Sequence, residues 1–232
     1  MKTVTFNNKS NHDFNLQILD WERHILPDLE NEYREIAGKD IKRNTKESIS
    51  NQTLRIEFLR RNKDIDEWLD VRNEIVEWLF TREEVKIEVD DEPDIHYVGK
   101  VTSTDIPQKY MTAVRFWVEF TCHPVKYGKL VETNETEFTY DGTYDKTPFK
   151  ITLENVTTNE LVVSVNGVEI KYTEPLQNAT VTIDSEELEL RVNGELKVFE
   201  VEGYFSFLKP GQNVIETNID ADITIEYMEL FL

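Results

Sequence analysis

The stretch Arg115–Gly128, RFWVEFTCHPVKYG, marks the point where one folded part of the chain ends and a different one begins. From Val114 to Cys122, apolar residues occupy every second position and mostly polar residues fall between them. This is the period of a β-strand with one buried face. The strand leads directly into Pro124 and Gly128, after which the character of the sequence changes. The stretch therefore predicts the last strand of a first domain and the connection to a second.

The only cysteine of the chain, Cys122, stands next to a histidine, an arrangement that can lower a thiol pKa and produce a nucleophile. Successive side chains of a strand leave by opposite faces, so Cys122 should point into the core and His123 away from it. We interpret Cys122 as a small buried apolar residue and not as part of a reactive pair.

Length and composition allow two ordinary domains. The chain has 232 residues and one cysteine, so it can bury a sizeable core but cannot form an internal disulfide. No stretch approaches the roughly 18 apolar residues that cross a bilayer. The N-terminal sequence MKTVTFNNKSNHDF also lacks the apolar region of a secretory signal. We therefore expect a protein that is made in the cytoplasm and does not contact a membrane.

The formal charge of −20 is unevenly distributed. Residues 1–127 contain 19 Lys and Arg against 25 Asp and Glu, a net −6, whereas residues 128–232 contain 7 against 21, a net −14. A protein that reads nucleic acid needs clustered cations to displace the counterions of the phosphates. This charge balance argues against specific nucleic acid recognition, and the acidic surface favours solubility.

Residues 1–127 combine strands with one helix. The segments TVTF, TLRIEFLRR, VKIEV and IHYVGKV have the pattern of strands, with a hairpin turn at DDEPD. Helical periodicity covers Asp64–Phe80, where Asp64 and Glu67 have the form of a capping box. We expect this helix to pack on an antiparallel sheet in an α+β domain. The stripe predicted to face the sheet consists of Ile65, Trp68, Leu69, Arg72, Ile75, Val76 and Leu79.

Residues 128–232 carry no helical signal, and turn signals recur along them. The dipeptides DG at 141–142, NG at 166–167 and NG at 193–194 are typical of hairpins. The last two separate alternating runs, LVVSV from VEIKY and LELRV from LKVFEV. About eight strands fit this length, which suits a two-sheet β-sandwich or a jelly roll. The chain as a whole is predicted to be mainly β.

The histidines and glycines provide no recognisable chemical centre. His12, His24, His96 and His123 stand in unrelated places, and none has a second histidine or cysteine at metal-ligand spacing. There is no glycine-rich phosphate loop and no Gly-x-Ser-x-Gly elbow.

The many carboxylates do not single out a site either. We interpret the acidic runs Asp90–Pro93 and Asp184–Leu188 as solvated turns and not as a glycosidase pair. Asp141, Asp145 and Asp220–Asp222 do not follow a calcium-loop pattern. We therefore predict no catalytic, no cofactor-binding and no metal-binding residue, and a protein that functions by binding or assembly.

Four stretches of the chain resemble motifs of one family, the distal tail proteins (Dit) of long-tailed siphophages. EIAGKD at 35–40 resembles an early glycine-basic-aspartate loop, and FTCHPVKYG at 120–128 resembles the residues that close the family's first domain. VTIDSEELELRVNG at 181–194 resembles a strand and hairpin, and LKPGQNVI at 208–215 a late Pro-Gly-x-Asn turn. The motifs are short, and they follow the family order along the whole chain. One departure is Ile41, which stands where the family often has a second glycine.

The resemblance implies a structural protein of a siphophage or prophage tail tip, without enzymatic activity and without a cofactor. It implies that residues 1–127 form a six-membered ring around the tail channel, and that residues 128–232 form a galectin-like β-sandwich on the outside. It further implies contacts with the tail tube protein, with the tail-associated hub protein and, in some tails, with a receptor-binding protein. The protein would then be a virion component, located in the baseplate.

The main alternative is a carbohydrate-binding protein, because galectin-like sandwiches bind sugars through exposed aromatic side chains. Residues 128–232 contain no tryptophan, and their aromatic residues mostly alternate as core residues would. A glycoside hydrolase, the third hypothesis, needs two carboxylates held in a cleft, which the sequence does not single out. The aromatic residues in question are Tyr140, Tyr144, Tyr172, Phe199, Tyr204, Phe205, Phe207, Tyr227 and Phe231.

Overall fold

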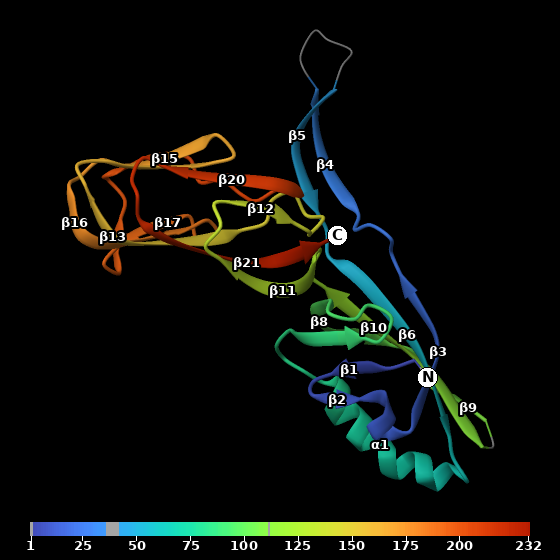
Figure 1. The fold of residues 1–232 in the computed structure, drawn as a ribbon. Coiled ribbons are helices and arrows are strands. Elements are labelled where there is room, and N and C mark those ends of the chain that lie inside the picture. The colour runs from blue at the N-terminus through green and yellow to red at the C-terminus, as the bar shows by residue number, and fades with distance from the viewer. Residues whose placement is uncertain (1, 36–41, 111) are drawn as a thin grey trace. The chain divides into compact units, whose positions relative to one another are not determined.

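The computed structural model describes residues 2–35, 42–110 and 112–232 (Figure 1). The chain forms two compact units, Met1–Tyr127 together with Leu232, and Gly128–Phe231. We call them unit 1 and unit 2. Strands dominate both units, and the described residues contain a single α-helix. The expected mainly β fold with one helix in its first part is confirmed.

Unit 1 contains strands, one short 3-10 helix and one α-helix. Its elements are β1 (Val4–Phe6), β2 (Lys9–Ser10), η1 (Asn11–Phe14), β3 (Leu16–Arg23), β4 (Leu29–Glu35), β5 (Lys42–Ile49), β6 (Gln52–Arg61), α1 (Ile65–Leu79), β7 (Val85–Val89), β8 (His96–Thr104), β9 (Gln108–Lys109), β10 (Ala113–Cys122) and the start of β11 (Lys126–Thr133). All the strands expected in this part of the sequence are present.

The main sheet of unit 1 is antiparallel, with the strand order β7-β8-β10-β6-β3. Its centre is the strand predicted at the opening stretch, β10, which pairs with β6 from Ala113↔Arg61 to Cys122↔Gln52 and with β8 on its other side. Every second residue of β10 is buried, as the alternation predicts. The expected hairpin between the strands VKIEV and IHYVGKV joins β7 to β8.

Helix α1 begins where the sequence predicts. The Asp64 side chain caps it by accepting a hydrogen bond from the Glu67 N–H at 3.0 Å. The second half of the expected capping box differs, because the Glu67 carboxylate accepts from the Lys63 N–H, at 2.7 Å, one residue before the cap. Glu67 therefore accepts a hydrogen bond from the Lys63 N–H just before the helix, and its carboxylate also lies near Arg60 at the end of β6.

The buried face of α1 differs in part from the predicted stripe. Trp68 and Ile75 are buried in the unit 1 core as predicted, whereas Leu69 and Val76 are 46% and 54% exposed. Trp78, which the stripe omits, is only 1% exposed. The helix is therefore rotated relative to the prediction, and Trp78 packs against the rings of Phe6, Phe14 and Phe58.

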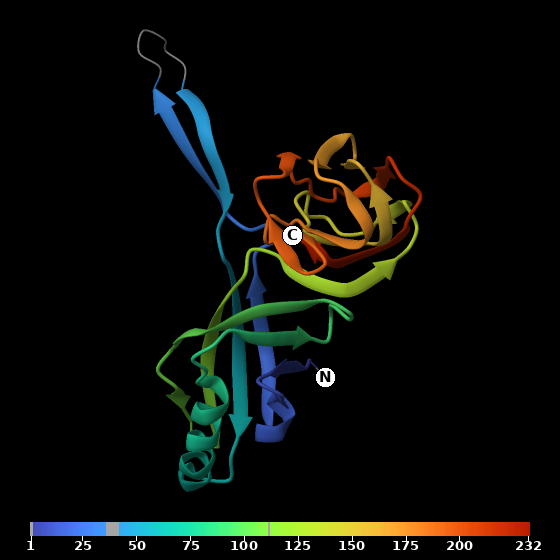
Figure 2. The same cartoon turned by 90° about the vertical axis from the view of Figure 1, so that its left-hand side faces the viewer.

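Strands β4 and β5 form a separate two-stranded antiparallel ribbon, paired from Leu29↔Ile49 to Glu35↔Lys42. Figure 2 shows this ribbon extending away from the main sheet of unit 1. Neither strand pairs with any other described strand. Most of the EIAGKD motif, including Gly38, and the departure at Ile41 lie in 36–41, outside the described residues, so this part of the resemblance stays a prediction.

The described residues of unit 2 form strands and the loops between them, without a helix. The strands are the remainder of β11 and β12 (Glu137–Tyr140), β13 (Phe149–Thr158), β14 (Leu161–Val165), β15 (Val168–Tyr172), β16 (Leu176–Asp184), β17 (Glu189–Val192), β18 (Glu195–Lys197), β19 (Val201–Gly203), β20 (Gly211–Thr217) and β21 (Asp222–Phe231).

These strands form two sheets around one core. One sheet has the order β18-β17-β16-β13-β21-β11, and the other β12-β20-β14-β15-β19. Buried residues of both sheets, such as Ile151 of the first and Val163 of the second, belong to the same hydrophobic cluster. This is the arrangement of a β-sandwich, and both sheets are open. There are more strands than the eight expected, because the run LKVFEV divides into β18 and β19, which belong to different sheets, and because β11, β12 and β20 match no predicted run. The predicted strand YFSFL at 204–208 is wrong, since only Leu208 makes an isolated bridge there.

Two of the three predicted hairpin dipeptides are confirmed. Asn166 and Gly167 have φ of 53° and 81° between β14 and β15, and Asn193 and Gly194 have φ of 50° and 85° between β17 and β18. Positive φ at both central residues is what a two-residue hairpin turn requires.

The prediction for the dipeptide DG at 141–142 is wrong. The preceding strand, β12, pairs with β20 and not with the strand that follows the dipeptide. Gly142 is nevertheless required there, because a Cβ atom at this position would lie 2.0 Å from the Tyr140 hydroxyl and 2.5 Å from the Leu230 carbonyl oxygen. The glycine provides space for a buried tyrosine and does not form a hairpin turn.

Candidate functional site

Cys122 and His123 leave β10 on opposite sides, as the strand geometry predicts. The Cys122 side chain is 1% exposed and belongs to the unit 1 core. Burial raises the pKa of its thiol to about 12, so the thiol stays protonated at neutral pH. The interpretation of Cys122 as a buried apolar residue is confirmed.

His123 instead joins a small polar cluster at the end of unit 1. Its Nδ1 lies 2.7 Å from the Tyr127 hydroxyl, and its Nε2 lies 2.7 Å from a Glu84 carboxylate oxygen. The ring of His96 stacks on Tyr127, with ring centroids 5.7 Å apart, and burial lowers the pKa of this histidine. The view that the histidines stand apart is therefore wrong for His96 and His123. The pairing of Tyr127 with His96 between β11 and β8 brings them together.

The acidic run DDEP is an exposed turn, as predicted, but it also makes ion pairs with the rest of unit 1. Arg23 of β3 makes an ion pair with Asp91 and another, at 3.2 Å, with Glu92. Glu92 also accepts hydrogen bonds from the Tyr97 hydroxyl at 2.8 Å and from Lys126 Nζ at 3.2 Å. Burial is the main cause that raises the pKa of Tyr97, so this hydroxyl remains a donor. The acidic turn between β7 and β8 therefore contacts β3 through Arg23, β8 through Tyr97 and β11 through Lys126.

The acidic run Asp184–Leu188 is a turn, as predicted. Asp184 Oδ1 accepts hydrogen bonds from the N–H groups of Glu186 and Glu187, at 2.9 and 3.2 Å, and so stabilises its own turn. Within the described ranges, no group of three or more His, Cys, Asp or Glu side chains is arranged to hold a metal ion. No helix in the same ranges has the length and apolar character needed to span a bilayer.

Unit 1 exposes several large apolar side chains that could bind another protein. Leu69 and Val76 of α1 and Phe80, the C-cap residue directly after it, are 46%, 54% and 70% exposed. Leu69 and Val76 are seven residues apart, which places them on one side of the helix, and Phe80 follows at its end. We call these three residues the helix stripe. Ile25 and Leu26, in the loop before β4, are 94% and 63% exposed. Apolar residues grouped on a surface are typical of sites of protein association.

The helix stripe was not predicted, because the periodicity places Leu69 and Val76 on the buried face. The available signal was the distribution of apolar residues around the helix. Trp78 and Leu69 cannot both face one sheet, because nine residues of α-helix correspond to two and a half turns. An apolar residue on each side of the helix therefore indicates that one side stays exposed or meets a partner.

Unit 2 has its own exposed apolar residues, between its edge strands β18 and β19 and directly after β19. Val198 and Phe199 are 61% and 97% exposed, and Tyr204 is 79% exposed. Most of the aromatic residues considered for sugar binding are instead buried or half-buried, as predicted, and Tyr140 and Tyr227 are core residues. Sugar binding through Phe199 or Tyr204 stays a prediction.

Two family descriptions match consecutive parts of this chain. The phage tail protein RIFT-related domain matches residues 5–122, and the C-terminal domain of the siphovirus-type tail component matches residues 141–231. The chain belongs to the siphophage distal tail protein family. The resemblance based on four short motifs is therefore confirmed. Distal tail proteins are structural components of the phage tail and baseplate, and hence of the virion.

The distal tail protein fold is also seen in a solved structure. The crystal structure of SPP1 Dit, described as a paradigm of the hub adsorption apparatus in phages that infect Gram-positive bacteria, aligns with a TM-score of 0.80 and 17% identity over 100% of both chains. At this identity the match shows the shared fold.

Two further structures, of the phage P2 baseplate in its activated conformation with Ca and with Sr, align with a TM-score of 0.46 and 11% identity. The first covers 99% of this chain and 98% of the other, and the second covers 98% of both. No curated protein matches this chain.

Proposed function

We propose that this protein joins the tail tube to the tail-associated hub and host-adhesion proteins, as a six-membered ring around the tail channel. Its partners are further copies of the chain, the tail tube protein, the hub protein and, in some tails, a receptor-binding protein. It functions by association and performs no catalytic step. Membership of a family of structural tail components supports this role.

The observation that carries the proposal is the apolar surface of unit 1. A closed ring repeats one interface by rotation, so each subunit must present two different patches that complement each other. The helix stripe and the exposed residues Ile25 and Leu26 lie on different elements of unit 1. They are two separate apolar patches of the kind that such an interface buries.

The distribution of charge supports assigning the ring contacts to unit 1. Residues 1–127 have 19 cationic against 25 anionic side chains, so opposite charges can be paired between neighbours. Residues 128–232, at 7 against 21, would repel their copies if these were packed closely. Salt screens this repulsion, so moderate ionic strength should favour the ring and very dilute buffer smaller species.

Light scattering coupled to size-exclusion chromatography tests the ring. At a concentration on the order of tens of micromolar, the main species should have six times the chain mass of 27.4 kDa. Val76→Asp should weaken assembly at least about tenfold, because the interface would bury a charge. Val198→Asp, a matched change at an exposed valine of unit 2, should not. A monomer at every ionic strength, or equal effects of the two variants, would contradict the proposal.

We also propose that units 1 and 2 are separate folding domains, corresponding to residues 1–127 and 128–232. Each unit has its own hydrophobic cluster, and the two family descriptions divide the chain in the same region. A calorimetric scan should therefore contain two transitions, and a core substitution in one unit should lower the midpoint of one transition alone. A single transition that shifts as a whole after either substitution would argue for one cooperative domain.

A further inference from the structure

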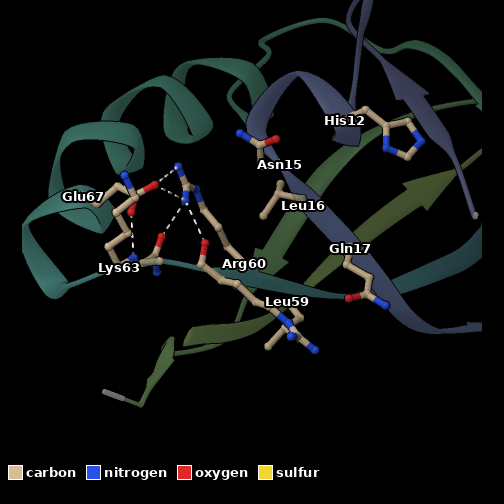
Figure 3. Close-up of a pocket in the computed structure, with 10 residues that line it drawn as sticks. His12, Asn15, Leu16, Gln17, Leu59, Arg60, Lys63 and Glu67 are labelled. Carbon is tan, nitrogen blue, oxygen red and sulfur yellow. Dashed lines mark hydrogen bonds and ion pairs between the residues drawn. The ribbon is translucent and has the colours of Figure 1, made fainter. Parts of the chain in front are cut away.

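A polar recess of about 690 Å³ lies at the end of β6, beside η1 and the start of α1 (Figure 3). Its lining includes Arg60, Arg61 and Lys63, with Glu67 as the only acidic residue. Three cationic side chains and one anionic side chain give this recess a local positive excess, in a chain whose formal charge is −20. Such a concentration of cations calls for an explanation.

The position of Arg60 follows from the alternation of β6. Leu54, Ile56 and Phe58 face the core, and Arg60 takes the next position on the same face. Its residue exposure is only 3%. A buried guanidinium is costly unless its charge is paired and its donors have acceptors. The hydrogen-bond partners of Arg60 therefore decide what the recess can bind.

One edge of the Arg60 guanidinium is fully used. Nη1 donates to Asn62 Oδ1 at 2.6 Å, to the Arg61 carbonyl oxygen at 3.3 Å and to Glu67 Oε1 at 3.4 Å. Figure 3 shows Arg60 reaching from β6 towards α1, where its guanidinium meets Glu67. These acceptors hold the side chain in place and occupy only part of its five N–H donors.

The other edge of the guanidinium is almost free. Nη2 makes one long contact, 3.5 Å to Glu67 Oε1, and Nε has no partner among the described residues although it is buried. Nε and Nη2 project their hydrogens along the same edge of the planar group. A carboxylate can accept from both in a bidentate pair, the geometry that arginine is suited to form.

The rim of the recess adds two cations, of which Lys63 interacts with Glu67 only at a distance. Arg61 and Lys63 are exposed, and their side chains make no ion pair with a described residue. The Glu67 carboxylate cannot neutralise them all, because it already accepts from the Lys63 backbone N–H and contacts Arg60. That backbone hydrogen bond is the main reason why the pKa of Glu67 is lowered, and the charges of Arg60 and Lys63 add to it, so this one anion is shared by two cations of the recess.

We propose that this recess binds the carboxylate of an aspartate or glutamate side chain presented by a neighbouring protein chain. The carboxylate pairs with the Nε and Nη2 edge of Arg60, and the positive charges of Arg61 and Lys63, which also line the recess, attract it. Because Nε is covered, entry requires a rearrangement of the side chains around it. The inference holds whether or not the chain forms a ring.

A carboxylate fits this recess better than the phosphates of a nucleic acid do. A polyanion needs a run of cations along its length. Here the exposed acids Asp64, which caps α1, and Asp66 and Asp70 of α1 follow the recess along the chain and would repel the next phosphates. A single side-chain carboxylate needs only the three cations of the recess.

Thermal unfolding of the full chain with a small probe tests this inference. N-acetyl-glutamate methylamide should raise the unfolding midpoint of unit 1 saturably, because a ligand of the folded state stabilises it. The glutamine analogue, matched in shape but uncharged, should not. Glutarate tests whether the recess binds a free dicarboxylate, and inorganic phosphate tests whether it binds any small anion. At equal concentration and ionic strength, each should raise the midpoint less than the glutamate probe does. Equal shifts with the glutamate and glutamine probes, or a larger shift with glutarate or phosphate, would overturn the proposal.

Variants locate the probe at the recess. Arg61→Gln combined with Lys63→Gln should raise the dissociation constant of the glutamate probe at least about fivefold. Arg82→Gln combined with Lys146→Gln removes the same charge at exposed positions elsewhere and should change it less than about twofold. Arg60→Lys keeps the charge but removes the planar fork, so it should abolish most of the shift, unlike Arg82→Lys. If the control pair weakens binding as much as the recess pair, the site is not the recess.

Discussion

Replacing Trp78 with alanine should lower the free energy of unfolding of unit 1 by about 3–5 kcal/mol. The Trp78 side chain is 1% exposed, and its ring contacts those of Phe6, Phe14 and Phe58 at centroid distances of 6.3, 4.8 and 6.1 Å. Its Nε1 also donates a 2.7 Å hydrogen bond to the Phe6 carbonyl oxygen. Alanine therefore removes packing at the centre of the helix–sheet interface and leaves a buried carbonyl oxygen without its donor.

Urea unfolding followed by circular dichroism measures this loss, at one protein concentration for all variants. Ile106→Ala is the control, because Ile106 is a large apolar residue of unit 1 that lies outside the helix stripe and is 89% exposed. It should change the free energy of unfolding by less than about 0.5 kcal/mol. A loss below about 1 kcal/mol for Trp78→Ala would mean that α1 does not depend on this side chain for its position on the sheet.

The strands of this protein could be predicted because their signal is local. In β10 the alternation from Val114 to Cys122 corresponds residue by residue to burial, since a central strand with one face on the core keeps a period of two. The hairpin turns at Asn166 and Asn193 were equally predictable, because the required positive φ depends on two neighbouring residues.

The orientation of α1 could not be predicted in the same way. Periodicity predicts a helix, but a helix with apolar residues on two sides does not determine which side meets the sheet. That choice depends on Phe6, whose carbonyl oxygen binds Trp78 over a separation of 72 residues. The exposed helix stripe is a consequence of this long-range contact, and therefore it was not identified from the sequence.

The polar clusters have the same non-local origin. Arg23 meets Asp91 across 68 residues, and His96 meets Tyr127 through strand pairing. Such residues are far apart in the sequence, so no motif with a fixed residue spacing predicts that they meet. Arg60 is different, because its position on the inward face of β6 can be read from the alternation of Leu54, Ile56 and Phe58, and a charge at an inward position was a visible sign of a polar site.

A second large effect is expected in unit 2, where Asn213→Ala should cost about 2–4 kcal/mol. Asn213, in the LKPGQNVI stretch, is 0% exposed. Its Oδ1 accepts from the Lys209 N–H at 3.0 Å and from Asn166 Nδ2 at 2.8 Å, and its Nδ2 donates to the Lys209 and Gly211 carbonyl oxygens at 2.8 and 3.0 Å. This one side chain therefore closes the turn before β20 and links it to the β14–β15 hairpin, and alanine would leave all four groups without this partner.

Calorimetry can assign the loss, because the transition of unit 2 should move to lower temperature while that of unit 1 stays unchanged. Asn134→Ala is the control, since Asn134 is exposed and makes no side-chain hydrogen bond with a described residue, and it should have an effect below about 0.5 kcal/mol. Asn213→Asp separates the two halves of the side chain. It keeps the acceptor used by Lys209 and Asn166 but loses the donor to two carbonyl oxygens, and it places a charge in a buried site. If the turn depends on that donor, Asn213→Asp should destabilise unit 2 at least as much as Asn213→Ala. A wild-type midpoint for Asn213→Asp would contradict the donor role of Nδ2.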